Sequence, residues 1–159
     1  MKVIFLDVDG VLNSEKSRNE MYDNNENWMW NEVAYYHLEK LKKIVEKTGA
    51  TIVLSSSWRL YHPKLTGFSE VKDELLKVLI DKMNNLGLKI EDVTPDFHDR
   101  WRGCEIEDWL KNHPEVEKYI ILDDDTDFLP EQKPFFIKTT FKEGLTDELT
   151  EKAIQILKE

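Results

Sequence analysis

Short runs of apolar residues alternate along the chain with longer segments in which apolar residues recur every three or four positions. The short runs predict buried strands and cover residues 3–6, 50–54, 88–93, 119–122 and 135–137. The longer segments predict amphipathic helices over residues 31–47, 69–86, 104–111 and 146–157. Strands that alternate with helices in this way predict an α/β fold, a three-layer α/β/α sandwich around a mainly parallel sheet.

Two intervals lack such a pattern and are interpreted as loops. Residues 14–27 are rich in Asn, Glu and Ser, and residues 61–69 contain one proline and one glycine. Trp28 and Trp30 follow the first interval, and we interpret them as packing that loop onto the body of the protein. The 159 residues suit one domain, so we predict a single domain over residues 1–159.

Composition and charge narrow the class of protein. A hydrophobic fraction of 40% with 34% charged residues is typical of a globular protein, and no apolar run is long enough to span a membrane. We see no secretory leader, and Cys104 is the single cysteine, which excludes an intrachain disulfide and a cysteine-based zinc site. We therefore expect a cytoplasmic protein.

The formal net charge of −10 argues against a broad basic face that grips a long nucleic-acid duplex. A nucleotide or the end of a strand stays possible. A bound cation and one or two arginines are enough to hold a single phosphate locally.

Two carboxylates follow the first predicted strand. Asp7 and Asp9 lie one residue apart and are followed by Gly10, which can turn sharply. The carboxyl ends of strands in α/β sheets are where ligands bind. Two acids so close repel each other unless a positive charge lies between them, and Mg²⁺ prefers oxygen ligands of this kind. The alternative is an acidic surface turn.

A second acidic strand end favours the metal site over the surface turn. The run 123–127 contains four aspartates and directly follows the strand at residues 119–122. Between the two acidic ends, the strand at residues 50–54 leads into three serines, whose hydroxyls can donate to phosphate oxygens. Periodicity does not decide which serine faces the site. Trp58 is open to stacking on a base or to packing, and Arg59 to binding a substrate phosphate.

A basic residue opens the helix that precedes the second acidic strand. Free N–H groups and the helix dipole favour anions at a helix N-terminus, so Arg102 is a candidate for neutralising charge there. Arg100 is a competitor for the same role.

The order of these features resembles the haloacid-dehalogenase (HAD) superfamily of phosphotransferases, over residues 3 to about 137. The runs Asp-x-Asp-Gly-Val-Leu-Asn, Ser-Ser-Ser-Trp-Arg and Arg-Gly-x-Glu-Ile-x-x-Trp-Leu also resemble a small HAD group associated with RNA-repair, or Swiss Army Knife, proteins. The resemblance implies a HAD-type Rossmannoid sheet. Because both intervals between the motifs are short of patterned chain, we expect a minimal cap domain or none.

The resemblance also implies a chemistry: Mg²⁺-dependent hydrolysis of a phosphomonoester through an aspartyl-phosphate. Asp7 would be the nucleophile, and Asp9 the general acid and base, with its backbone carbonyl on the metal. Asp123 and Asp124 would complete the metal shell. The expected contacts to substrate are Ser55, Ser56, Trp58, Arg59 and Arg102. The superfamily often has lysine at the Arg102 position, and arginine also binds phosphate.

An open site suits a macromolecular phosphate, and by the same resemblance a 3′-phosphate of RNA or DNA, or a nucleotide, is the leading substrate. The alternatives are a small metabolite, a phosphoprotein, or a non-catalytic module that binds a phosphorylated ligand or works like a signalling receiver. A receiver domain carries its acceptor aspartate on a later strand, whereas here the strand at residues 50–54 ends in serine. The sequence does not predict an oligomeric state.

Overall fold

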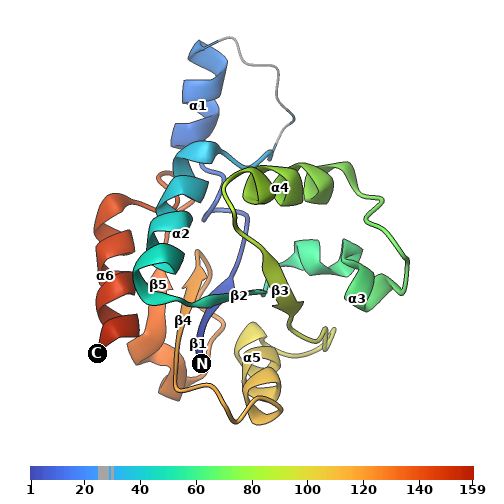
Figure 1. Cartoon of the computed structure of the whole chain (residues 1–159), viewed down its shortest axis with the longest axis vertical. Coiled ribbons are helices and arrows are strands. Elements are labelled where there is room, and N and C mark those ends of the chain that lie inside the picture. The colour runs from blue at the N-terminus through green and yellow to red at the C-terminus, as the bar shows by residue number, and fades with distance from the viewer. Residues whose placement is uncertain (25–28, 30) are drawn as a thin grey trace.

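The protein is built on one parallel sheet of five strands, in the order β3-β2-β1-β4-β5 (Figure 1). The computed structural model describes residues 1–24, 29 and 31–159, so the interpretation of Trp28 and Trp30 falls outside the described residues. The strands are β1 (Lys2–Leu6), β2 (Thr51–Leu54), β3 (Ile90–Val93), β4 (Lys118–Asp123) and β5 (Phe136–Lys138).

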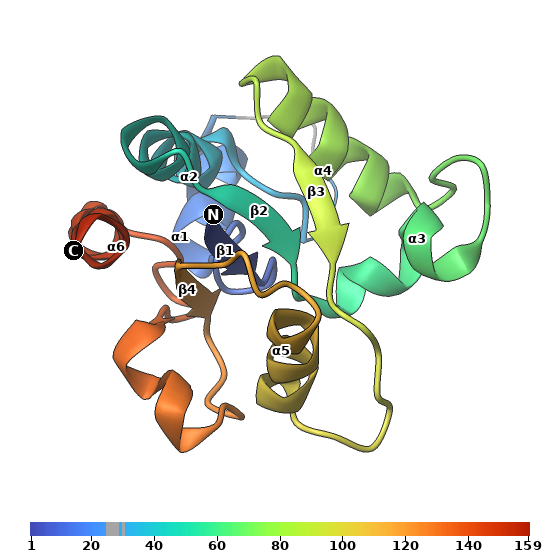
Figure 2. The same cartoon turned by 60° about the horizontal axis from the view of Figure 1, so that its bottom comes forward.

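Helices cover both faces of this sheet. The first face packs against α2 (Tyr35–Thr48), α4 (Glu74–Asn85) and α6 (Asp147–Lys158). The opposite face packs against α5 (Arg102–Lys111), and the short 3-10 helix η2 (Pro130–Phe135) lies on the same side (Figure 2). The predicted three-layer α/β/α sandwich with a Rossmannoid sheet is confirmed.

After Lys2, central strand β1 is apolar, and its residues 3–6 are buried on both sides of the sheet. Ile4 and Leu6 belong to the core beneath α2, α4 and α6, whereas Val3 and Phe5 belong to the core beneath α5. The Phe5 ring meets the Trp109 ring of α5 edge to face, with 5.3 Å between centroids. Alternate side chains of one strand thus bind the two helical layers together.

The first predicted loop contains a helix, so that interpretation is wrong. Helix α1 (Glu15–Asp23) lies at the top of Figure 1, above the start of α2, and its Lys16 Nζ donates to Tyr36 Oη at 3.1 Å. It begins with a capping box in which Ser14 and Ser17 satisfy each other's backbone N–H groups. Apart from Ser17, only Met21 is buried in this helix, so it carries no apolar stripe for the sequence to reveal.

Other element ends differ from the prediction by a few residues. Helix α2 begins at Tyr35 because Asn31, the expected cap, has a backbone φ of 68°, outside the helical region. Helix α4 begins at Glu74, where the Asp73 side chain accepts a hydrogen bond from the Leu76 N–H. The second predicted loop holds the end of a 3-10 helix, η1 (Ser57–Tyr61), and a short helix, α3 (Pro63–Thr66). Among the described residues, no helix is long and apolar enough to cross a membrane.

Candidate active site

Three neighbouring strands deliver the predicted polar residues to one edge of the sheet. Leu6 of β1 pairs with Leu54 of β2 and with Leu122 of β4. Asp7, Ser55 and Asp123 occupy the next position on each strand. The Asp7 N–H donates to Leu122 O at 2.9 Å, and the Ser55 N–H donates to Leu6 O at 2.8 Å. Strand pairing therefore continues up to the candidate site and fixes the backbone there.

Three carboxylates from the two acidic strand ends converge. Asp7, Asp123 and Asp124 each place a carboxylate oxygen within 4.8 Å of the others, and they form the single group of possible metal ligands found in the described part of the chain. Asp7 and Asp123 are 7% and 1% exposed. Carboxylates held this close and this dry are a donor set suited to a hard divalent cation.

Arg102 projects from the start of α5 into this cluster. Its Nη1 lies 2.8 Å from Asp123 Oδ2 and 3.2 Å from Asp7 Oδ1. The Arg102 backbone N–H donates to Asp127 Oδ2 at 3.1 Å, which anchors the helix start. The Arg100 guanidinium instead lies over the Phe97 ring, 5.3 Å from its centroid. Of the two arginines, the structure places Arg102 at the carboxylates.

Burial makes the negative charge of the cluster costly. Burial, followed by the charge of Asp123, raises the pKa of Asp7 to about 8, although Arg102 acts in the opposite direction. Burial also raises the pKa of Asp123 and of Asp124. One arginine offsets one of three carboxylate charges, and a divalent cation would neutralise the other two. The residues present therefore fit Mg²⁺, with Asp7, Asp123 and Asp124 to hold it.

Gly10 lets the two acidic strand ends approach each other. Its φ is 77°, and a Cβ at this position would lie 2.3 Å from Asp124 Oδ2. Only glycine combines that backbone conformation with that space.

Gly10→Ala is expected to displace Asp124 and to strain the turn. We expect half-saturation by Mg²⁺ at a concentration at least about tenfold higher, and a stability loss of about 1–3 kcal/mol. Titration with Mg²⁺ and thermal unfolding measure the two effects. Gly67→Ala is the matched control, because Gly67 has a φ of 73° and open space around its Cβ position. An equal change in Mg²⁺ requirement in both variants would contradict this account.

Asp9 lies beside the carboxylate cluster rather than in it. Asn13 Nδ2 donates to Asp9 Oδ1 at 2.8 Å, and Trp58 Nε1 donates to Asp9 Oδ2 at 3.0 Å. Trp58 is 7% exposed, so it packs and orients Asp9, and most of its ring is covered by protein. Asn13 also accepts the Gly10 N–H at 2.9 Å. Sequence reasoning gave Asn13 no role, although it lies in the first quoted motif.

The serines after β2 differ in their contacts. Ser55 Oγ is buried and has no hydrogen-bond partner within the described residues, so it is available to a ligand. Ser56 Oγ accepts the Trp58 backbone N–H at 3.2 Å, and a hydrogen bond from this hydroxyl to Asp7 lowers the pKa of that carboxyl. Ser57 is exposed.

Arg59, an expected contact to substrate, points into the protein in this structure. Its Nη2 lies 2.7 Å from Glu105 Oε2 of α5 and 3.6 Å from Asp96 Oδ1. Its side chain is 5% exposed. The guanidinium forms ion pairs with a buried acid, Glu105, and a half-buried one, Asp96, so the charge of Arg59 is neutralised within the fold.

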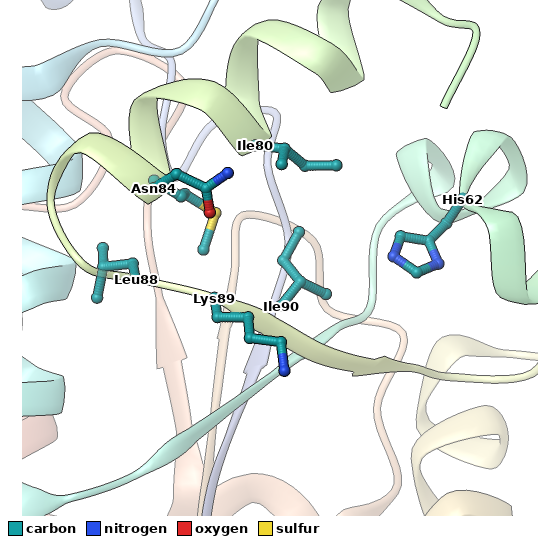
Figure 3. A pocket seen from close by; sticks show the side chains of 7 residues that line it. His62, Ile80, Asn84, Leu88, Lys89 and Ile90 are labelled. Atoms are coloured by element: carbon teal, nitrogen blue, oxygen red, sulfur yellow. The ribbon is translucent and has the colours of Figure 1, made fainter. Parts of the chain in front are cut away.

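A separate cavity of about 260 Å³ lies between α4 and β3 (Figure 3). Its lining is mostly apolar, with His62 and Lys89 at its side, and includes none of the carboxylates described above. This cavity is therefore separate from the carboxylate cluster at the strand ends.

A parallel sheet with aspartates after β1 and β4, a serine after β2 and an arginine on α5 is the arrangement of a HAD-type domain. The chain belongs to the family described as the HAD domain in Swiss Army Knife RNA repair proteins, whose model matches residues 3–150. This membership supports a HAD-type phosphatase in general terms. No curated protein matches the chain significantly, and neither does any solved structure.

Proposed function

We propose that the protein is a Mg²⁺-dependent phosphomonoesterase that works through an aspartyl-phosphate on Asp7. The observation that carries this proposal is the shared position of three groups at one sheet edge. Asp7 lies in the carboxylate cluster, its charge partner Arg102 reaches it at 3.2 Å, and the Ser55 hydroxyl beside it has no partner in the described structure. In this proposal, the nucleophile, the positive charge and a hydroxyl that donates a hydrogen bond to phosphate lie at the same edge of the sheet.

Each residue has a step in this reaction. A carboxylate oxygen of Asp7 attacks phosphorus as the bond to the leaving oxygen breaks, and Asp9 gives that oxygen a proton. Asp9 then takes a proton from the water that cleaves the acyl phosphate. Bound Mg²⁺ supplies positive charge that offsets the repulsion between the Asp7 carboxylate and the phosphate dianion. Ser55 and Arg102 hold the oxygens of the phosphoryl group during transfer.

Phosphate release from p-nitrophenyl phosphate, with Mg²⁺ and with EDTA, tests this proposal. We expect turnover with Mg²⁺ and loss of at least about a thousandfold after chelation. Release that persists in EDTA would contradict the metal role. A receiver-like domain would become phosphorylated without turning over, and a binding module would bind phosphate without any release.

For the substrate, we propose a terminal 3′-phosphate on RNA or DNA. The matched family is named for RNA repair proteins, and Trp101, 60% exposed, stands directly before Arg102 at the start of α5. An exposed indole beside a phosphate site is a platform for the base next to that phosphate. The net charge of −10 favours a strand end over a long duplex.

Trp101→Ala is expected to lower the turnover of oligonucleotides and to leave the turnover of small phosphates unchanged. The kcat/KM for a 3′-phosphorylated oligonucleotide should fall about 5–100-fold, the range expected for one lost base–aromatic stack. The kinetics with p-nitrophenyl phosphate should stay within about twofold. Phe68→Ala is the control, because Phe68 is similarly exposed and lies beneath Lys72. An equal loss on both substrates would reject the platform, and better turnover of small metabolites or phosphopeptides would reject the nucleic-acid end.

A further inference from the structure

The residues that would hold the phosphoryl group come from two elements distant in sequence. Ser55 begins the turn at residues 55–59, which we call the serine turn, whereas Arg102 begins α5. A pocket assembled from two such elements works only if their spacing is fixed. A misplacement of about 1 Å can cost a hundredfold in rate.

Arg59 connects these two elements at the other end of the serine turn. Its Nη1 donates to the Ser56 carbonyl oxygen at 2.7 Å, and its Nη2 donates to Glu105 Oε2 at 2.7 Å. Glu105 lies one turn along α5 from Arg102, and its Oε1 accepts the Phe97 N–H at 3.0 Å. Both charged side chains are only 5% exposed.

The other side of α5 is fixed independently. The Gly103 N–H donates to the Asp127 carbonyl oxygen at 3.1 Å, and Gln132 Nε2 donates to the Gly103 carbonyl oxygen at 2.8 Å. A Cβ at Gly103 would lie 2.7 Å from the Leu129 backbone nitrogen, so the start of α5 packs directly against the backbone of that segment. With its first turn anchored to the loop after β4, α5 can hold the serine turn through Glu105.

We propose that the buried ion pair of Arg59 and Glu105 is a strut that sets the width of the phosphate pocket. It holds the turn that carries Ser55 against the helix that carries Arg102. Both members of the pair are positioning residues, since neither contacts the carboxylate cluster. The inference rests on the proposed function, because it takes Ser55 and Arg102 as the groups that bind phosphate.

The test uses the double variant Arg59→Met/Glu105→Leu, which removes both charges and keeps a similar volume. Replacing Arg59 and Glu105 together leaves neither of these two buried charges unpaired, and Asp96, whose side chain is 19% exposed, keeps partial access to water, so the variant is expected to fold. We expect at least about a tenfold loss of affinity for inorganic phosphate and of kcat/KM, with half-saturation by Mg²⁺ within about twofold of wild type. Lys43→Gln/Glu151→Gln, at the exposed ion pair between α2 and α6, should change neither quantity.

Wild-type phosphate affinity in the folded double variant would overturn the strut, and so would a parallel loss of Mg²⁺ and phosphate binding, which marks general damage. If the double variant does not fold, Arg59→Lys is measured instead, and unchanged phosphate affinity there would overturn the strut. If the wild type binds phosphate but shows no turnover, the proposed function fails, and phosphate affinity alone judges the strut.

Discussion

Asp7→Asn is expected to abolish phosphate release and, in the same experiment, to stabilise the metal-free protein. Asparagine cannot form the acyl phosphate, so turnover should fall by at least about 10⁴-fold. The amide is nearly isosteric and carries no charge into a buried cluster. Loss of function with gain of stability would separate a nucleophile from a residue needed for folding.

The pH dependence of this stabilisation follows from the raised pKa of Asp7. An unfolded aspartate titrates near 3.8 and the folded one at about 8, so between these values the native state binds more protons than the unfolded state. Below pH 3.8 the Asp7 carboxyl is neutral in both states, and its burial costs no charge desolvation. As the pH rises towards 8, the unfolded state gains the ionised form first, so the free energy of unfolding falls. At pH 8 without metal, Asp7→Asn should be more stable than wild type by up to ~5 kcal/mol, or about 10–20 °C in Tm.

Thermal unfolding at pH 5 and pH 8, with EDTA or with Mg²⁺, measures this difference. The advantage of Asp7→Asn should shrink towards pH 5, and saturating Mg²⁺ should reverse it because wild type binds the ion more tightly. Asp125→Asn, at an exposed acid of the same loop, is the control. A metal-free variant less stable than wild type at pH 8 would contradict the electrostatic account.

Arg102→Met is expected to reduce kcat/KM about 10²–10³-fold. The change removes the guanidinium that pairs with Asp7 and Asp123. It also removes the positive charge that we propose stabilises the transferring phosphoryl group. Arg102→Lys should recover part of the loss, since lysine keeps the charge but not the planar fork. Steady-state kinetics with p-nitrophenyl phosphate make the measurement.

Arg100→Met is the matched control, because that guanidinium lies over Phe97. It should leave the kinetics with p-nitrophenyl phosphate within about twofold of wild type. A loss in Arg100→Met as large as that in Arg102→Met would mean that the wrong arginine has been placed in the site.

The sheet and the ends of its central strands could be predicted because their chemistry is local. Strand β1 lies at the centre of a parallel sheet and is covered on both faces, so it reads as an unbroken apolar run. The polar residue after each such run marks the edge where ligands bind. Asp7 and Asp123 are found on this principle alone, whereas Ser55 is selected among three serines only by the family resemblance.

The partners of the polar residues could not be predicted, because they are set by packing between distant segments. Trp58 and Asp9 are separated by 49 positions, and Arg59 and Glu105 by 46. The sequence shows that Trp58 and Arg59 follow a candidate serine. It does not show that Trp58 donates a hydrogen bond to Asp9 or that Arg59 pairs with Glu105 of α5. Helix α1 was not predicted for a different reason: it buries too few apolar side chains to produce a helical pattern in the sequence.

Trapping the phosphoenzyme tests the central claim most directly. Wild-type protein is quenched in acid during turnover with Mg²⁺, and borohydride reduction converts an acyl-phosphorylated aspartate to homoserine, which mass spectrometry locates. The account predicts homoserine at Asp7, and none there in Asp7→Asn. Turnover with the modification at another residue, or with no modified residue in the wild type, would contradict it.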